Sequence, residues 1–360
     1  MKRLLSVLAL SGCLVGRVAA QVDGTVGAGI GTVRYAGGTG FSSASFSPTA
    51  TYDSPLFTAS AGGVFASLPG GVWSTQGRGE VWGASPQLSE RVHLAIQATA
   101  ARTSRSDGGW SAAANAVGEV LWTAPKGGVG LGAGPSAGWI ADQPSVAALH
   151  LRGRMWRQSG WANWVVSLEP TRFPAGWFTD ISAGVELNRG RVMAAFWAVG
   201  RVSAAYTSAA AASGMVQVFV VPSIAVEIGG GSYLPEPYQG FPRAGYFTAG
   251  VRLHARRRPA ASPIAAAPAT PLVPARVGDS LVVRFRLAGA SSVAIAGDWT
   301  AWKPAPLRSL GPGRWEGVLA LPPGLYHFNL LVDGKEWVVP NGVTTVDDGF
   351  GGMVGVLVVP

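Results

Sequence analysis

The sequence predicts an all-β protein in two parts: an antiparallel β-barrel of the outer-membrane type with about 12 strands, then a small immunoglobulin-like β-sandwich. Three observations lead to this fold class. Apolar and polar residues alternate over long stretches, which is the period of a strand. The 360 residues include 51 glycines and only 13% charged residues, as in a helix-poor chain. Beyond the N-terminus, no apolar run approaches the roughly 18 residues that a membrane helix requires.

The first 20 residues have the pattern of a secretory signal peptide. A basic start and an apolar stretch lead to a small-residue cleavage site that ends at Ala20. Residues 10–13 also resemble a lipoprotein box, which would place a lipid on Cys13; cleavage after Ala20 is the favoured alternative. A chain cleaved there has no cysteine, which excludes disulfides, thiolate metal sites and cysteine nucleophiles.

Residues 21–258 repeat one pattern, in which about ten alternating residues are followed by a turn. In residues 91–100, for example, Leu94 and Ile96 share one face, and His93 and Gln97 share the other. A soluble sandwich and a membrane barrel both fit such strands. Their length, the mixed charges on their polar faces and the aromatic residues near their ends favour the barrel, whereas the many alanines and glycines on the apolar faces favour the sandwich. The aromatic residues near strand ends are Trp73, Trp82, Trp110, Trp122, Trp139, Trp177 and Phe178.

Several function classes find no support in this first region. The net charge is +9, but the basic residues are scattered rather than gathered on one face, which argues against nucleic-acid binding. His93, His150 and His254 lie far apart in the sequence and predict no metal site. Residues 127–134 are glycine-rich but lack the ending of a phosphate loop, so we interpret them as a strand with small residues. We expect no cofactor.

Residues 259–278 form a predicted linker between the two parts. Prolines recur every few residues up to Pro274, which favours an extended, semi-rigid spacer. The arginines at 256–258 are interpreted as a solvated boundary, with contact to anionic lipid headgroups as the alternative.

Residues 279–360 predict a compact sandwich of about seven short strands. An alternating stretch from Val293 leads into the turn Gly297-Asp298, and tryptophans follow at 299 and 302. A hairpin is predicted at Asp333-Gly334, with Trp337 on the returning strand. These motifs would present aromatic side chains at one surface.

The order and spacing of these motifs resemble a known family. The segments 297–302, 321–328, 332–337 and 350–352 look like the glycogen-binding module of AMP-activated protein kinase β-subunits, in carbohydrate-binding module family 48. The resemblance covers about 80 residues and implies α-glucan binding by sugar rings stacked on two tryptophans. The matching positions are Trp302 and Trp337.

The resemblance also implies further site residues, of which several depart from the family pattern. Phe350 matches a leucine that contacts the glucan, and Asn329 matches a lysine. Gly352 and Val354 stand where the family has threonine and asparagine, so much of the polar clamp is missing and altered specificity is expected. Trp299 and Trp315 match core positions. The predicted carbohydrate-binding residues are Trp302, Trp337, Asn329 and Phe350.

The sequence favours a non-enzymatic function: an exported outer-membrane barrel that carries a glucan-binding module in the periplasm. An even-stranded barrel returns both termini to that side. Asp347 and Asp348 are interpreted as turn residues rather than a catalytic pair. The expected partners are an α-glucan or another polysaccharide and outer-membrane lipid. One alternative is an interaction protein whose sandwich docks a protein or cell-wall partner, and another is a soluble accessory or degenerate enzyme of polysaccharide metabolism.

Overall fold

The computed structural model describes residues 21–360 except 55–56, 90, 160, 256–270, 279, 288–289, 312, 341 and 349–351. The predicted signal peptide, the arginine triplet and most of the predicted linker therefore lie outside the described residues. Among the described residues, no helix is long and apolar enough to cross a membrane.

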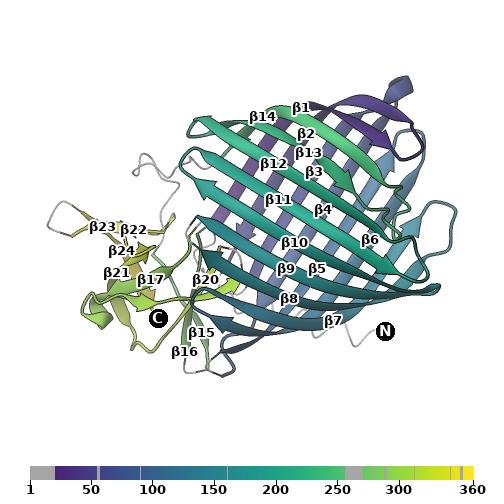
Figure 1. Ribbon diagram of the computed structural model, residues 1–360. Helices are drawn as coiled ribbons and strands as arrows, with labels where there is room; N and C mark the ends of the chain where they lie inside the picture. Colours follow the sequence, from purple (N-terminus) through teal and green to yellow (C-terminus); the bar gives the residue numbers. More distant parts are fainter. Residues whose placement is uncertain are drawn as a thin grey trace.

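The N-terminal region is a closed antiparallel barrel of 14 strands, in which neighbours in sequence pair with each other and β1 pairs with β14 (Figure 1). The predicted all-β fold class and barrel are confirmed. The barrel strands are β1 (Gln21–Tyr35), β2 (Gly40–Asp53), β3 (Phe57–Ser67), β4 (Trp73–Ala84), β5 (Val92–Arg105), β6 (Trp110–Ala124), β7 (Gly127–Ile140), β8 (Val146–Ser159), β9 (Ala162–Phe173), β10 (Gly176–Arg189), β11 (Val192–Ser203), β12 (Ala209–Val221), β13 (Ile224–Tyr233) and β14 (Ala244–His254).

The predicted number of about 12 strands was wrong. Alternation reveals a strand only where its two faces differ in polarity, and β1 and β2 are rich in Gly, Ala, Ser and Thr. Their backbones nevertheless pair over nearly their whole length, as in the ladder from Gln21 with Asp53 to Arg34 with Gly40. These strands are defined by their backbone hydrogen bonds and not by a difference in polarity between their two faces.

The glycine-rich segment 127–134 lies in β7, as predicted. Its glycines at alternate positions point into the lumen, where side chains of β6 and β8 cover them. A Cβ atom on Gly132 would lie 2.6 Å from Cγ of Glu119, and one on Gly130 would lie 2.9 Å from Leu121. The absence of side chains at Gly130 and Gly132 therefore leaves room for the charged pair of Glu119 and Arg154, whose Oε2 and Nη2 atoms are 2.6 Å apart.

The two faces of the barrel wall differ in polarity. Outward residues are apolar and exposed, such as Ile96 at 57% and Leu131 at 59%. The lumen face holds ion pairs, including those of Arg201 with Asp180 and Arg252 with Glu227, each at 2.7 Å. Five of the aromatic residues predicted near strand ends are exposed at such ends, namely Trp73, Trp110, Trp122, Trp139 and Trp177. Trp82 and Phe178, each 3% exposed, are buried instead.

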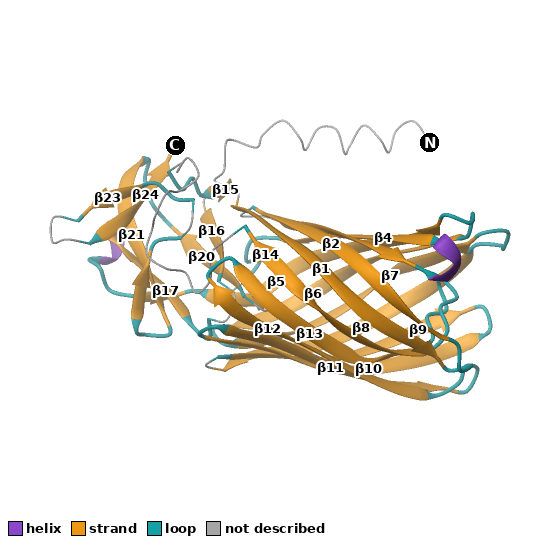
Figure 2. Ribbon diagram, turned by 90° about the horizontal axis from the view of Figure 1, so that it is seen from above, coloured by secondary structure: helices purple, strands orange, loops and turns teal. Residues whose placement is uncertain are grey.

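The two ends of the barrel differ in their connections. At one end the strands are joined by tight turns, such as residues 125–126, 190–191 and 222–223, and both β1 and β14 have their outer termini there. At the other end most connections are longer, up to residues 234–243, although residues 174–175 also form a tight turn there. The C-terminal module lies at the short-turn end (Figure 2).

The module is a sandwich of two sheets. One sheet has the order β15-β16-β20-β19, and the other has the order β18-β17-β21-β24-β23 with β22 beside β21. Leu281, Phe285, Ile295, Trp315 and Phe328 lie in the core between them. The bounds are β15 (Ala275–Val277), β16 (Ser280–Arg286), β17 (Val293–Gly297), η2 (Asp298–Thr300), β18 (Ala305–Pro306), β19 (Arg308–Gly311), β20 (Arg314–Leu319), β21 (Gly324–Val332), β22 (Glu336–Val338), β23 (Thr345–Asp347) and β24 (Met353–Val359).

The end of the predicted linker contacts the module. Leu272 is 4% exposed, and its backbone N–H donates to Val356 O at 2.8 Å. β15, which also lies in the predicted linker range, pairs with β16. The described residues from 271 onward therefore pack with the sandwich.

Candidate carbohydrate-binding groove

Trp302 is presented by a tight loop after β17. Thr300 Oγ1 accepts a hydrogen bond from Gly297 N at 3.0 Å, and Trp302 N donates to Gly297 O at 3.1 Å. Ala301 and Trp302 both have positive φ angles, 49° and 60°, which are uncommon for residues other than glycine. These bonds hold the strained backbone in place, and the indole of Trp302 stays 40% exposed.

An aspartate at the start of this loop ties it to the neighbouring strand. Asp298 Oδ2 accepts a hydrogen bond from the backbone N of His327 at 2.7 Å and lies 3.1 Å from His327 Nδ1. Because β21 pairs directly with β17, this contact fixes the loop that carries Trp302 against the sheet.

Trp337 is placed by the hairpin between β21 and β22. Asp333 and Gly334 have φ angles of 53° and 67°, as in a type I′ turn, and Lys335 N donates to Val332 O at 3.0 Å. Asp333 Oδ1 also accepts hydrogen bonds from the backbone N–H groups of residues 291 and 292, both at 2.8 Å. Trp337 pairs with residue 331 of β21 and is 49% exposed.

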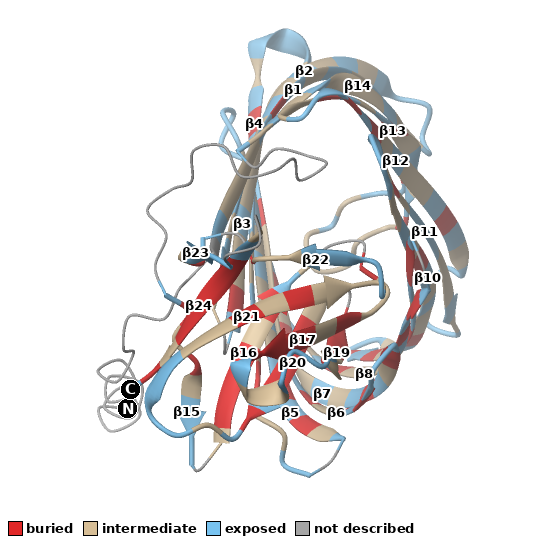
Figure 3. Cartoon of the chain, turned by 90° about the vertical axis from the view of Figure 1, so that its left-hand side faces the viewer, coloured by how far each residue is buried: buried red, intermediate tan, exposed pale blue. Residues whose placement is uncertain are grey.

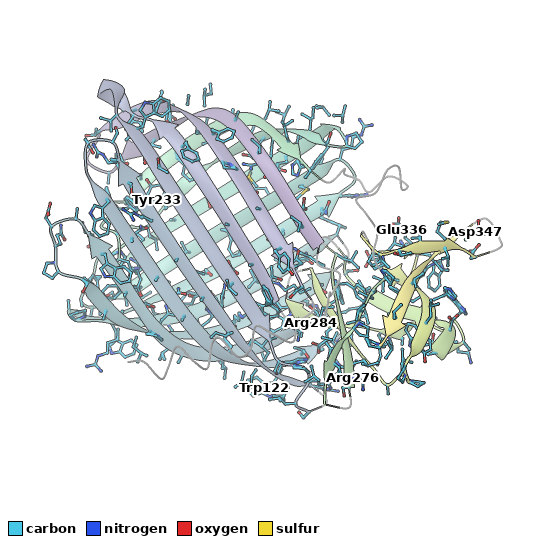
Figure 4. All side chains as sticks on the ribbon, turned by 180° about the vertical axis from the view of Figure 1, so that it is seen from behind. Trp122, Tyr233, Arg276, Arg284, Glu336 and Asp347 are labelled. Atoms are coloured by element: carbon cyan, nitrogen blue, oxygen red, sulfur yellow. The ribbon has the colours of Figure 1, made fainter. Side chains whose placement is uncertain are left out.

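The two tryptophans line one groove on the module. Its volume is about 550 Å³, and its lining residues are Trp302, His327, Asn329, Trp337, Val346, Asp347, Asp348 and Val354. Asn329 Nδ2 donates to Met353 O at 3.1 Å, while its buried Oδ1 has no hydrogen-bond partner among the described residues. In Figure 4, Asp347 lies on the side of the module away from the barrel, whereas Arg284 lies between module and barrel.

The structure brings together three of the four predicted carbohydrate-binding residues, Trp302, Trp337 and Asn329. Phe350 lies outside the described residues. Trp315, at 1% exposed, lies in the core, and Trp299 packs against the core, as predicted for both.

Four groove residues were missed by the sequence analysis: His327, Val346, Asp347 and Asp348. Alternation on β21 was a usable signal for His327, because it shares a strand face with Asn329. The interpretation of Asp347 as a turn residue was wrong. It ends β23 and pairs with Met353 of β24, and this pairing brings it to the groove. No short-range sequence pattern reports that pairing.

The groove contains the kinds of groups that contact sugars in proteins. Exposed indoles offer apolar faces, and the Asp and Asn oxygens are hydrogen-bond acceptors for hydroxyl groups. Over the described part of the chain, no three His, Cys, Asp or Glu side chains are grouped as metal ligands.

Comparison with solved structures finds matches of low identity and low TM-score. OmpF of Salmonella typhi, solved in complex with daunomycin, has a TM-score of 0.40 and 8% identity over 65% of this chain and 97% of that chain. OccK2 of Pseudomonas aeruginosa, solved in complex with glucuronate, has a TM-score of 0.37 and 9% identity over 66% and 98%. The Ralstonia pickettii toluene transporter TbuX has a TM-score of 0.34 and 9% identity over 68% and 91%. The barrel assignment rests on the strand pairing described above.

A search of curated proteins gave no match. A family model matches the C-terminal part of the chain, over the residues that form the two sheets and the groove. Residues 280–360 match the family described as the glycogen recognition site of AMP-activated protein kinase, and this module is joined to a 14-stranded barrel.

Proposed function

We propose that this protein is an outer-membrane β-barrel that holds an α-glucan-binding module at its periplasmic mouth. The observation that carries the proposal is the pair of exposed indoles, Trp302 and Trp337, in one groove of a module that matches a glycogen-recognition family. Apolar faces of glucose rings would stack on the indoles, while polar groove atoms would bind the hydroxyl groups.

The polar lining favours an uncharged glucan. Asp347 and Asp348 place carboxylates in the groove, where an anionic glycan would be repelled. Carboxylates accept hydrogen bonds from sugar hydroxyls. A short neutral α-1,4-glucan therefore fits this chemistry, and Asn329 and Phe350 remain proposed contact residues.

The membrane location rests on the polarity of the wall. A closed barrel satisfies all its strand hydrogen bonds internally, and an apolar outer face suits lipid. In such barrels the short turns face the periplasm, so the module at the short-turn end would lie there. This arrangement counts against a soluble accessory enzyme.

A purely structural role for the sandwich is the second candidate. The observation that favours it is the extensive contact of the β16–β20–β19 face with the barrel, described below. The indoles of Trp302 and Trp337 are nonetheless exposed outside that contact, which leaves them open to a ligand.

The proposal is tested with the full-length protein in detergent micelles or liposomes. We expect it to cosediment with insoluble starch and to bind maltoheptaose in calorimetry. The double variant Trp302→Ala/Trp337→Ala should lose at least about tenfold in affinity, since aromatic anchors commonly dominate binding.

Leu325→Ala is a matched control, because Leu325 is exposed on the same strand as Asn329 but does not line the groove. This variant should bind as the wild type does. The absence of starch and maltoheptaose binding by folded wild-type protein would refute the glucan proposal.

A further inference from the structure

The face of the module opposite the groove carries a set of charged residues that water does not reach. Glu316 on β20 is 1% exposed, and its Oε2 lies 2.6 Å from Nη2 of Arg284 on β16. Burial of such an ion pair costs free energy of desolvation unless each of its polar groups is hydrogen-bonded. The remaining partners come from the barrel.

His93 of β5 provides the first of these partners. Its Nε2 lies 2.6 Å from Glu316 Oε1, and both side chains are fully buried. Its Nδ1 lies 3.4 Å from Thr123 Oγ1 of β6, which orients the ring. Burial alone raises the pKa of Glu316, but the hydrogen bond to His93 and the charge on Arg284 outweigh it, so the pKa lies below its usual value.

The backbone at the end of β4 provides the second partner. Arg284 Nη2 donates to the carbonyl oxygens of Ala84 and Ser85, both at 2.9 Å. At the edge of the contact, Arg286 Nη1 lies 3.2 Å from Asp53 Oδ1 at the end of β2. The module therefore satisfies carbonyl and carboxylate groups that strand ends would otherwise expose to water.

Apolar and aromatic groups surround these charges. Leu310 of β19 is fully buried in a cluster with Trp82, Leu121 and Trp156 of the barrel. Trp156 Nε1 donates to Ser309 Oγ at 3.3 Å. The guanidinium of Arg314 lies 4.5 Å from the centre of the Trp82 ring, in the geometry of a cation–π contact. The contact is thus buried and contains an aromatic anchor, as in stable interfaces.

Several of the contacting side chains face the lumen at one side of the mouth. His93, Trp156 and Gln158 alternate with the outward residues of β5 and β8. Seen from the module end, the module lies across the side of the mouth formed by β5 to β8 (Figure 3). Barrels of about 16 strands leave an aqueous channel, so a 14-stranded barrel has a lumen that such an insertion would narrow.

We propose that the module is a resident partial plug, in which the β16–β20–β19 face is seated in the periplasmic mouth of the barrel and narrows the passage until it undocks. The proposal rests on the membrane location given above but not on glucan binding. It explains why one face of the sandwich is charged and buried while the other carries the groove.

Cysteine accessibility tests docking directly, because the only cysteine of the chain is Cys13 and the described residues contain none. Ser309→Cys would report on the interface, since Ser309 is fully buried, and Thr345→Cys would report on an exposed strand of the same module. In liposome-inserted, folded protein, we expect a membrane-impermeant maleimide to modify Ser309→Cys at least about tenfold more slowly than Thr345→Cys. Equal rates would overturn the proposal.

Two histidine variants provide a matched pair. His93 and His150 both face the lumen, both lie near a threonine and both contact a glutamate, but the partner of His150 is Glu169 of the barrel itself. His93→Ala should accelerate modification of Ser309→Cys at least about tenfold, because charge-assisted hydrogen bonds are the strong ones. His150→Ala should leave it unchanged. Equal acceleration by both would indicate general loosening of the barrel and would overturn the docking role of His93.

If Ser309→Cys does not fold, Gln158→Cys gives the same readout from the barrel side, because Gln158 is 1% exposed and donates to Gly311 O of the module at 3.3 Å. Planar-bilayer recording tests the plug. The full-length wild type should show a lower conductance than the His93→Ala/Arg284→Ala variant. If docking is intact in the wild type and both proteins show the same conductance, the proposal that the module narrows the passage is wrong.

Discussion

The barrel strands bury their polar faces, whereas the module strands bury their apolar faces. On β5 the apolar residues Leu94 and Ile96 are exposed, and polar His93 is buried inside. On β16 the apolar residues Leu281 and Val283 are buried between two sheets, while Arg284 points outward to the barrel. The same period-two pattern thus produces two architectures, because the surroundings of each strand decide which face is covered.

The largest effect is expected from a core substitution in the module. Trp315→Ala removes a side chain that is 1% exposed and should cost about 3–5 kcal/mol in the free energy of unfolding of the module. Trp302→Ala removes an exposed indole and should cost under about 1 kcal/mol. Urea denaturation of the full-length protein, followed by tryptophan fluorescence, measures both. Similar costs would contradict the assignment of Trp302 to the surface.

A charge on the outer barrel wall should have the next largest effect. Ile96→Arg places a guanidinium on the lipid-facing side and should cost about 2–4 kcal/mol if Ile96 lies near the bilayer midplane. Leu325→Arg, at a residue 59% exposed on the module, should change stability by under about 0.5 kcal/mol. Unfolding from lipid vesicles compares the two. A tolerated Ile96→Arg would show that this face contacts water and would revive the soluble alternative.

Acid should weaken the contact between the two parts. The pKa of Glu316 is lowered in the folded protein by His93 and Arg284, which outweigh the effect of burial. The stabilisation is therefore fully present above the ordinary pKa of about 4.5 and is lost as the pH falls through the lowered value. The urea midpoint of the module transition, measured from pH 6 to about pH 3, should fall in wild type and fall less in Glu316→Gln. Parallel pH profiles would show that other groups are responsible.

The smallest effect is expected in the groove. Asp347→Asn keeps the shape of the side chain but weakens its acceptor capacity, so affinity for maltoheptaose should fall by about twofold to tenfold, or about 0.4–1.4 kcal/mol. Stability should not change, because Asp347 ends an exposed strand. Calorimetry at pH 7 gives both affinities. An unchanged affinity would remove Asp347 from the proposed contacts.

Much of the fold was predictable where side-chain contrast was strong. Residues 91–100 predicted β5 and its two faces, and the Asp333-Gly334 signal predicted the hairpin between β21 and β22. The strand count was too low because small residues weaken the alternation in strands such as β1 and β2. In the groove, motif order identified Trp302, Trp337 and Asn329, while Asp347 entered it through the pairing of β23 with β24.

The sequence by itself determined that the chain forms strands and turns, that it has two parts, and that two tryptophans stand at presented positions. These features are local, because they depend on the period of side chains and on backbone angles at a few residues. Only the tertiary structure decided that His93 would meet Glu316, since 223 residues separate them and neither has a local partner pattern. The partner of a buried charge depends on the tertiary arrangement of the whole chain. In this protein that arrangement places the module against the mouth of the barrel.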